Sequence, residues 1–468
     1  MPDATLIRLT NLSWLLLIVG CGIWASERVA FSDSAYYLFQ MTQNQTWALE
    51  LHRYSAFIPQ TPALLAIWAE LPLIWVVQAF SLGYILLFVS IYYIITYRYK
   101  CPEAGMTLLL AFVLFIQKSF FHTVTETHQA IAYALGLYAA LGYTRNKAPW
   151  KLIAIASIWI LLGFFSHPVS LFLNVFVIAW RTHDTRSWKK VWPWLLIASL
   201  GIMYGLKVMF TDSNSYEGNL FDQIKSAPAL LPKLFSLPMI SFVKDNLIGF
   251  YAWYLFIAAS VLFCWLWKKD FYSILACFGA GLIFLIISLI TYNQGNSPIM
   301  LEKNFMPYAL FLGLPFIKEC LVREDSIFPK SLRYQLWGVL IFAGFTGLYS
   351  TAQWASSRTH WIDNMLTQAR ARGTEQHYII ERKQLPAEII HVDWALAPET
   401  LILSSLKYGP EGVITFFRVD SFASPPTDLS VTDLYMSTDF WLIWNAYTLN
   451  QNYFKFRAGH YIPWKDKL

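Results

Sequence analysis

Long apolar runs separated by short polar stretches recur along the first three quarters of the chain. A helix that crosses a membrane needs about 20 mostly apolar residues, and the runs near that length predict about eleven transmembrane helices. The runs lie at residues 12–27, 72–97, 104–120, 127–143, 150–166, 168–180, 192–210, 247–267, 272–291, 305–317 and 335–355. The pattern therefore predicts an all-α polytopic membrane bundle over residues 1–355 and a separate polar domain over residues 356–468.

Two predicted loops and the C-terminal region are longer than simple turns. The first loop, residues 28–71, has a semi-apolar second half, Phe57–Leu71, in which prolines recur, so it predicts short helices along the membrane surface. Residues 211–246 form a second long loop. In the C-terminal region the pattern predicts a helix at Arg358–Arg372 and a strand at Val413–Val419, hence a small mixed α/β domain.

Composition supports a membrane protein. The chain is 56% hydrophobic and only 14% charged, whereas soluble domains are usually about 25% charged. These values exclude a soluble single domain, a disordered chain and a disulfide-rich secreted scaffold. The five cysteines match no metal-binding or disulfide pattern. No small-residue cleavage site follows the first apolar run, so the sequence predicts an uncleaved first helix.

The positive charge lies in the membrane part of the chain. Residues 1–355 hold 24 Lys/Arg and 17 Asp/Glu, and residues 356–468 hold 11 and 12. This distribution favours loops facing anionic lipid and argues against a nucleic-acid surface. With a cytoplasmic N-terminus, the predicted inside loops carry 16 Lys/Arg and the outside loops 7. The positive-inside rule therefore predicts that residues 98–103, 181–191 and 318–334 are cytoplasmic. Eleven crossings would place the C-terminal domain outside.

Ionisable residues cluster on the predicted outer face. Such groups are costly at a membrane bundle and are functional candidates. They come from at least four loops and are Asp33, His52, Arg53, Glu126, His128, His167, Glu302 and Lys303. Together they predict a polar cavity that opens outward.

The carboxylates have competing interpretations. Asp33 is placed to act as a general base on an acceptor hydroxyl, but Ser32 or Asp33 is also a good helix N-cap. Glu126 and Gln129 have the spacing of a capping box, which leaves His128 unexplained. If Asp33, Glu126 and His128 converged, they could hold a divalent cation.

The basic residues also have alternatives. Arg53, beside His52, could bind a phosphate or extend towards lipid headgroups. Lys303 is predicted at the start of a helix, where a cation opposes the macrodipole unless Glu302 or a bound phosphate compensates it. A simple surface pair with Glu302 is the alternative. His167, between Ser166 and Pro168, marks either a functional or a plain turn.

These features resemble the GT-C fold of polytopic glycosyltransferases, similar to protein O-mannosyltransferases, aminoarabinose transferases and GPI mannosyltransferases. The resemblance covers about residues 1–320. Asp33 after the first helix, the stretch Phe57–Leu71, the turn Ser166-His167-Pro168 and the element Lys303-Asn304-Phe305-Met306-Pro307 carry it. Many members of this group have two adjacent acids in the first loop, whereas Ser34 follows Asp33 here, so Glu126 would have to supply a second acid.

The resemblance implies sugar transfer from a polyprenyl-phosphate-linked donor to a lipid, glycan or protein acceptor. Asp33 would be the base, with Glu126 and His167 as further catalytic residues. Arg53, Lys303 and His52 would bind the donor phosphate, and a divalent cation is a possible cofactor. The size fits a bacterial inner-membrane enzyme with a periplasmic active face. A transporter or flippase for a lipid-linked sugar or small solute is the alternative, although no inverted repeat is visible in the sequence.

Overall fold

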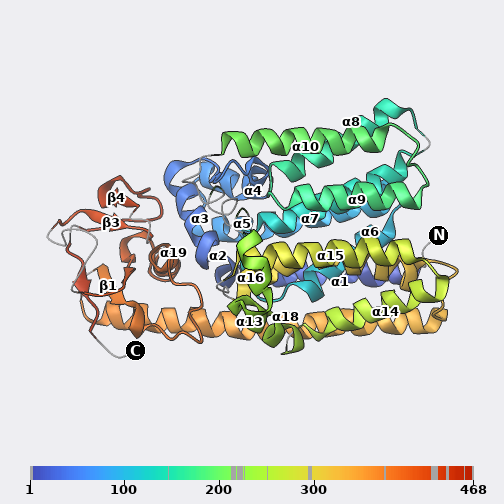
Figure 1. Ribbon diagram of the computed structural model, residues 1–468. Helices are drawn as coiled ribbons and strands as arrows, with labels where there is room; N and C mark the ends of the chain where they lie inside the picture. The colour runs from blue at the N-terminus through green and yellow to red at the C-terminus, as the bar shows by residue number, and fades with distance from the viewer. Residues whose placement is uncertain are drawn as a thin grey trace.

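A bundle of long helices and a smaller C-terminal domain make up the structure, a computed structural model of the whole chain (Figure 1). It describes residues 4–145, 147–211, 218, 225, 227–249, 251–293, 298–373, 376–422, 431–438, 442–457 and 459–465. Most of the predicted loop 211–246 before residue 227 therefore lies outside the described residues.

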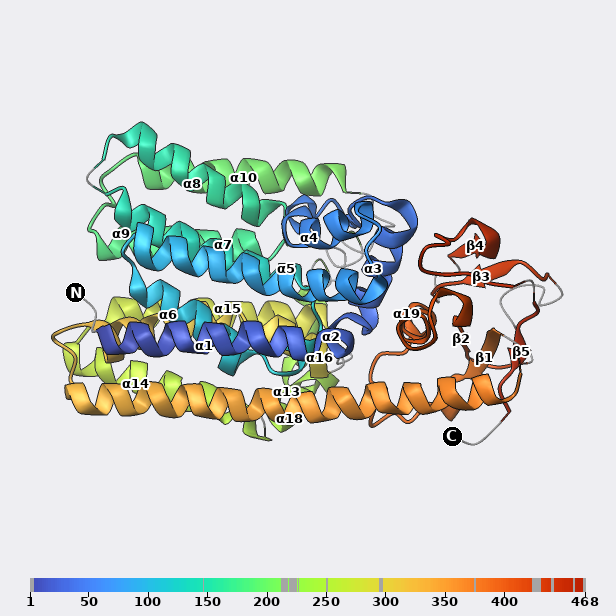
Figure 2. The same cartoon turned by 180° about the vertical axis from the view of Figure 1, so that it is seen from behind.

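The bundle helices lie roughly parallel or antiparallel to one another (Figures 1 and 2). Their bounds are α1 (Ala4–Ile23), α5 (Leu73–Tyr93), α6 (Pro102–Leu110), α7 (Glu126–Tyr143), α8 (Pro149–Phe164), α9 (Ser170–Asp184), α10 (Trp192–Phe210), α14 (Ala252–Lys268), α15 (Phe271–Thr291), α16 (Pro298–Phe305), α17 (Leu314–Phe316) and α18 (Lys330–Ala371). Short π-helical segments extend α5 over Ile94–Arg98 and α6 over Ala111–Phe115, and others flank α17 at Ala309–Gly313 and Ile317–Val322.

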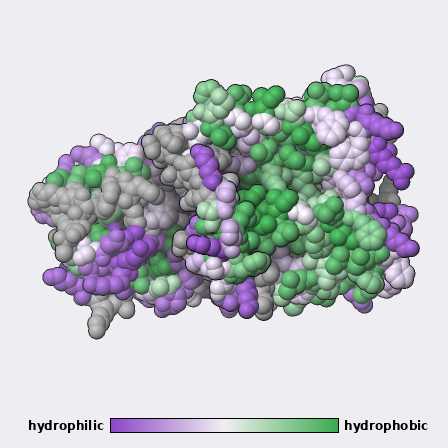
Figure 3. All heavy atoms as spheres, in the orientation of Figure 1, coloured by the Kyte–Doolittle hydropathy of each residue, from purple (hydrophilic) through white to green (hydrophobic). Residues whose placement is uncertain are grey.

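Among the described residues, five helical segments are long and apolar enough to cross a membrane. They are Ala4–Ile23, Leu73–Arg98, Trp192–Phe210, Phe271–Thr291 and Glu302–Val322, and shorter apolar helices lie at Pro102–Phe115, Pro149–Phe164 and Ala252–Lys268. Large apolar side chains also remain exposed along these helices, such as Leu15 on α1 and Leu275 on α15. On the face that Figure 3 shows, much of the bundle surface is apolar, which fits a lipid environment. The structure thus supports a membrane protein, and it shows fewer long spanning helices than the eleven runs predicted.

The first outer loop folds into α2 (Ala25–Val29), α3 (Ser32–Asn44), a 3₁₀ turn (Tyr54–Ala56) and α4 (Phe57–Trp68). The prolines do not break α4, which contains Pro62. A tight turn leads from α4 into α5, and a Cβ at Gly83 of α5 would lie 2.3 Å from the Pro59 carbonyl oxygen. Glycine therefore allows α4 to pack lengthwise against α5, whereas the sequence predicted a helix lying along the surface.

Further short helices lie in the segments between the bundle helices. They are a 3₁₀ turn at Lys118–Phe121, α12 (Ala227–Leu230), a 3₁₀ turn at Leu231–Ser236 and α13 (Pro238–Gly249). The π-helical extension of α6 packs closely against α18, where a Cβ at Gly344 would lie 2.4 Å from the Val113 carbonyl oxygen. Glycine at this position therefore allows the two helices to approach each other.

Helix α18 has 42 residues and connects the bundle to the C-terminal domain without a break. At 1.5 Å per residue it is about 63 Å long, twice the thickness of a membrane core. The predicted helix Arg358–Arg372 is its second half, and the expected boundary at residue 355 falls within it. Figure 2 places the start of α18 near the N-terminus and its end beside the C-terminal domain. The N-terminus and the C-terminal domain therefore lie at opposite ends of the bundle.

The C-terminal domain contains a small amount of sheet, as predicted. Its elements are β1 (His377–Glu381), a 3₁₀ turn (Arg382–Gln384), α19 (Leu396–Tyr408), a 3₁₀ turn (Pro410–Gly412), β2 (Thr415–Val419), β3 (Leu434–Met436), β4 (Ile443–Asn445), a 3₁₀ turn (Ala446–Thr448) and β5 (Ile462–Pro463). Parallel strands form one sheet in the order β2-β1-β5, with His377 opposite Thr415, while β3 and β4 form an antiparallel pair. The observed β2 matches the predicted strand Val413–Val419 closely.

The C-terminal domain is packed onto the first outer loop. Phe39 of α3 contacts the rings of Tyr435 and Phe454. The side chain of Asn450 donates a hydrogen bond to the Thr42 carbonyl oxygen at 2.8 Å. These contacts join the domain to α3, the helix that carries Asp33.

Candidate functional site

Asp33 lies in the first turn of α3, at the end of the bundle that faces the C-terminal domain. Phe31 occupies the N-cap position, and no side chain makes a capping hydrogen bond there. The interpretation of Ser32 or Asp33 as a helix cap is therefore wrong. The Asp33 Oδ2 atom instead lies 3.1 Å from His122 Nε2 and 3.7 Å from Lys303 Nζ. The carboxylate thus faces two basic groups from distant parts of the chain.

The three side chains differ in exposure. Asp33 is 37% exposed, while His122 and Lys303 are 3% and 9% exposed. Burial raises the pKa of Asp33, but the neighbouring His122 and Lys303, with Arg53, lower it by more, so the pKa lies below its usual range. Asp33 is therefore an ionised carboxylate at neutral pH that remains open on one side.

Lys303 reaches Asp33 because its neighbour Glu302 binds elsewhere. The Glu302 carboxylate accepts hydrogen bonds from the backbone N–H groups of Gln117, Lys118 and Ser119 at 3.1, 2.9 and 2.6 Å. It also accepts a hydrogen bond from the Tyr251 hydroxyl. The predicted surface pair of Glu302 with Lys303 is therefore not formed.

Lys303 lies at the start of a long apolar helical segment, as predicted. That segment runs over Glu302–Val322, and Lys303 is also in the last turn of the short helix α16. The carboxylate that compensates its charge in the structure is Asp33, and not Glu302.

A second ion pair lies between the first outer loop and α7. Arg53 Nη1 is 3.2 Å from Glu126 Oε2, and the Tyr37 hydroxyl is 3.5 Å from Glu126 Oε1. Gln129 accepts a hydrogen bond from the Ser55 hydroxyl at 3.2 Å. The capping-box interpretation of Glu126 and Gln129 is therefore wrong, because both side chains bind the first outer loop. Arg53 likewise points to protein and not to lipid headgroups.

His167 lies in the predicted turn between α8 and α9. The turn contacts the first outer loop, since the Ser55 N–H donates to the Phe165 carbonyl oxygen at 3.1 Å. Burial lowers the pKa of His167, and the positive charges of Arg53, Lys207 and Lys303 lower it further. The imidazole is therefore neutral at pH 7. The hydrogen bond between Ser55 and Phe165 places this turn beside the loop that carries Arg53.

Two predicted residues do not join this group. His52 is exposed in a left-handed backbone conformation and contacts the ring of Tyr54. His128 is buried, with its Nε2 atom 3.5 Å from the Ser119 hydroxyl. His128 lies within the regular helix α7, and it lines the inner side of the region that holds His122.

The metal candidates Asp33, Glu126 and His128 do not form a metal centre. Within the described part of the chain, no group of three or more His, Cys, Asp or Glu side chains is arranged to hold a metal ion. Lys303 beside Asp33 would also repel a divalent cation. The donor set here does not fit such an ion.

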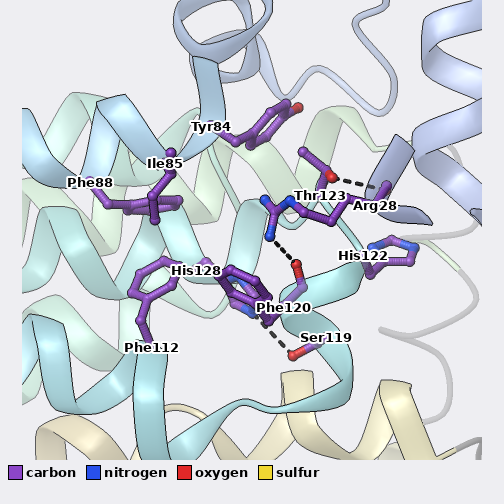
Figure 4. Close-up of a pocket in the computed structure, with 10 residues that line it drawn as sticks. All are labelled: Arg28, Tyr84, Ile85, Phe88, Phe112, Ser119, Phe120, His122, Thr123 and His128. Atoms are coloured by element: carbon purple, nitrogen blue, oxygen red, sulfur yellow. Dashed lines mark hydrogen bonds between the residues drawn. The ribbon is translucent and has the colours of Figure 1, made fainter. Parts of the chain in front are cut away.

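A small buried cavity lies behind the site (Figure 4). Its volume is about 10 Å³, roughly the space that one water molecule needs. His122 and His128 line it with Arg28, which donates hydrogen bonds to the Ser81 hydroxyl and the Phe120 carbonyl oxygen. The cavity is too small for a substrate, and it places a polar space on the inner side of His122.

Sequence reasoning missed the role of His122. The residue lies in the polar segment between α6 and α7, four positions before Glu126, and no local pattern links it to Asp33. Its place in a short segment between two apolar runs was the signal that the sequence offered. The sequence predicted that Asp33, Arg53, Glu126 and Lys303 lie on one face of the bundle, but it did not predict the pair Arg53–Glu126.

Comparisons with known proteins add no assignment. No protein-family model, curated protein or solved structure matches this chain.

Proposed function

We propose that the protein is a GT-C-like membrane glycosyltransferase of about eleven crossings that works on the extracytoplasmic side of a bacterial inner membrane. It would move a sugar from a polyprenyl-phosphate-linked donor to an acceptor hydroxyl. The observation that carries the proposal is Asp33, an ionised and partly exposed carboxylate that lies beside Lys303 and His122. A carboxylate next to a cation suits a reaction in which an acceptor hydroxyl loses its proton while a phosphate leaves the neighbouring anomeric carbon.

The orientation follows from charge and from the arrangement of the ends. The turn before α10 carries Arg186, Lys189 and Lys190, and Lys318, Arg323, Lys330 and Arg333 lie in and around the turn before α18. Both turns lie at the end of the bundle near the N-terminus (Figures 1 and 2). The positive-inside rule assigns that end to the cytoplasm. Asp33 and the C-terminal domain would then face the opposite side, where lipid-linked sugars are used without nucleotide donors.

The chemical step would be a single displacement. The acceptor oxygen attacks the anomeric carbon, the bond from that carbon to the phosphate oxygen breaks, and polyprenyl phosphate leaves. Asp33 takes the acceptor proton as the new bond forms. Its low pKa makes it a weak base, so the transfer occurs when the attacking hydroxyl has already become acidic.

Lys303 is the favoured partner of the leaving phosphate. Its ammonium group is buried beside Asp33, and electrostatic stabilisation is strong where water is excluded. Arg53 can add a second contact, because a guanidinium has five N–H donors and can keep its bond to Glu126. Neutral His167 could orient the sugar as a donor or acceptor of a hydrogen bond. His52 is the weakest of the phosphate candidates, given its exposed position.

The binding experiment uses purified protein in lipid nanodiscs and a polyprenyl phosphate as the probe. We expect Lys303→Ala to weaken binding at least tenfold, because the buried cation is lost. Lys244→Ala is the matched control, since Lys244 is an exposed lysine of α13 outside the site. Equal affinities for the Lys303→Ala variant and the parent would refute the phosphate site.

The transfer experiment uses polyprenyl-phosphate sugars with a membrane extract as the acceptor source. The parent should release polyprenyl phosphate and label an acceptor, and Arg53→Lys should reduce this release because the fork geometry is lost. Movement of the intact lipid-linked sugar between leaflets, with no release of polyprenyl phosphate, would favour the flippase alternative.

A further inference from the structure

A buried ion pair connects the C-terminal domain to the loop that carries Asp33. Arg358 of α18 and Glu399 of α19 are 1% and 0% exposed, and Arg358 Nη2 binds Glu399 Oε2 directly. Arg358 lies in the second half of α18, beyond the last predicted span, and Glu399 lies in the C-terminal domain.

One further oxygen of Glu399 and one further nitrogen of Arg358 bind the backbone just before Asp33. Glu399 Oε1 accepts the Ser32 N–H at 2.5 Å. Arg358 Nη1 donates to the Ala30 carbonyl oxygen at 3.1 Å. The guanidinium also lies over the ring of Phe31, 4.7 Å from its centre. Three consecutive residues are therefore held by one ion pair.

This stretch needs external support because its backbone is strained. Ser32 has a φ of 47°, in the left-handed region that residues other than glycine seldom adopt. Such a conformation is energetically unfavourable and persists only where surrounding contacts impose it. Asp33 is the next residue, so the position of its carboxylate depends on the Ser32 backbone.

Phe31 connects this stretch of backbone to His122, the residue that faces Asp33. Its ring makes edge-to-face contacts with His122 and with Trp354 of α18, at centroid distances of 5.6 and 6.0 Å. A shift of residues 30–32 would therefore move Asp33 and His122 relative to each other.

Packing alone does not explain an ion pair at this place. A buried ion pair is weak evidence for stability, because apolar residues of similar volume often stabilise a fold as well or better. Apolar side chains could not, however, accept the Ser32 N–H or donate to the Ala30 carbonyl oxygen. The specific contribution of Arg358 and Glu399 is thus to hold the backbone.

We propose that Arg358 and Glu399 are positioning residues, through which the C-terminal domain holds Asp33 against His122 and Lys303 in the geometry that transfer requires. The inference rests on the proposed function for the role of Asp33 as the base. The backbone restraint itself can be tested without any assay of transfer.

The test compares the full-length double variant Arg358→Met/Glu399→Leu with the parent protein in nanodiscs. The apolar pair keeps the buried volume and removes both backbone contacts. Lys407→Ala is the matched control, because Lys407 pairs with Asp363 and also links α19 to α18, but at the surface. Glu399→Gln serves as a second variant if the double variant does not fold, since one amide oxygen cannot replace both contacts of the carboxylate.

The first measurement is hydrogen exchange of a peptide covering residues 28–38. We expect at least tenfold faster exchange in the double variant and the parent rate in Lys407→Ala, with α5 unchanged in both. Parent-like exchange in the folded double variant and in Glu399→Gln would overturn the proposal. This result is independent of whether the protein transfers sugars.

The second measurement is the pH dependence of transfer. Misplacement of a reacting group by about 1 Å can cost 10²-fold in rate, so kcat should fall at least tenfold while the KM for the donor stays near the parent value. Asp33 would also lose part of the effect of its basic neighbours, which raises its pKa and moves the acidic limb of kcat/KM to higher pH. An unchanged kcat and pH profile would overturn the positioning role. Faster exchange in a protein without any transfer activity would instead refute the proposed function alone.

Discussion

Two acidic residues on either side of Ser32 illustrate how differently one charge can be used. Asp33 follows Ser32 in the chain, is 37% exposed and faces His122 and Lys303. Glu399 binds the Ser32 N–H from the C-terminal domain, is fully buried and has Arg358 as its ionic partner.

The surroundings of the two carboxylates indicate different roles: a binding site at Asp33 and a structural contact at Glu399. The charge of Glu399 is matched by one cation and its oxygens are occupied, so no room is left for a ligand. At Asp33 the carboxylate has two basic neighbours and an open side, so an anion and a hydroxyl could both be accommodated. Removing Asp33 should therefore affect chemistry, and removing Glu399 should affect the fold.

The largest effect is expected for Asp33→Asn. A positioned base typically contributes 10²–10⁴-fold to rate, so turnover should fall by about that factor while the protein stays folded. Measurement of polyprenyl phosphate release and of thermal unfolding on the same preparation would test this. Substantial turnover would remove Asp33 as the base, and loss of folded protein would make its role structural like that of Glu399.

Glu399→Ala should lower the stability of the fold, in addition to the loss of turnover expected when Asp33 is misplaced. The substitution leaves the buried Arg358 charge without its carboxylate, and breaking a buried pair in this way costs about 3–5 kcal/mol. We expect a strongly lowered Tm in detergent. A Tm equal to that of the parent would show that water reaches the Arg358–Glu399 pair. Glu399 would then not differ from Asp33 in its contribution to stability.

A buried histidine of the C-terminal domain, His377, provides a second case in which a titratable group contributes to stability and not to the site. His377 of β1 is 1% exposed, and neither ring nitrogen has a hydrogen-bond partner among the described residues. Burial lowers the pKa of His377 to about 4. An unfolded histidine has a pKa of about 6.5, so the unfolded chain binds the proton first as the pH falls.

The stability contributed by neutral His377 is therefore present above pH 6.5 and is lost as the pH falls from about 6.5 to about 4. The loss amounts to about 3 kcal/mol over this window. Thermal unfolding at several pH values should show this loss in the parent and a smaller one in His377→Phe, which keeps the contact with Phe456 and Tyr461. The same pH dependence in both proteins would assign the effect to other groups.

The smallest effect is expected for Lys407→Ala. The pair of Lys407 with Asp363 joins the same helices as Arg358 and Glu399, but it is about one third exposed. Exposed ion pairs contribute about 0–1 kcal/mol, so Tm should change little and less still at high salt. A large loss of stability would mean that the surface contact between α18 and α19, and not the buried pair, holds the C-terminal domain in place.

Local pattern alone determined a large part of the fold. The run at residues 192–210 coincides with α10, and the predicted turn at His167 lies between α8 and α9. The strand near residue 415 and the mixed character of the C-terminal domain were also predicted. These features depend on the length and spacing of apolar residues, which are properties of the sequence within one element.

Only the tertiary structure decided which charged groups pair. Asp33 meets His122 and Lys303, and Glu302 turns away from its neighbour to bind residues 117–119. Ser32 adopts its strained conformation while its N–H donates a hydrogen bond to Glu399, which lies 367 residues later in the chain. The sequence shows that these side chains are polar and in a membrane bundle, so each needs a partner. The choice of partner depends on how helices from distant parts of the chain pack, and no local period carries that information.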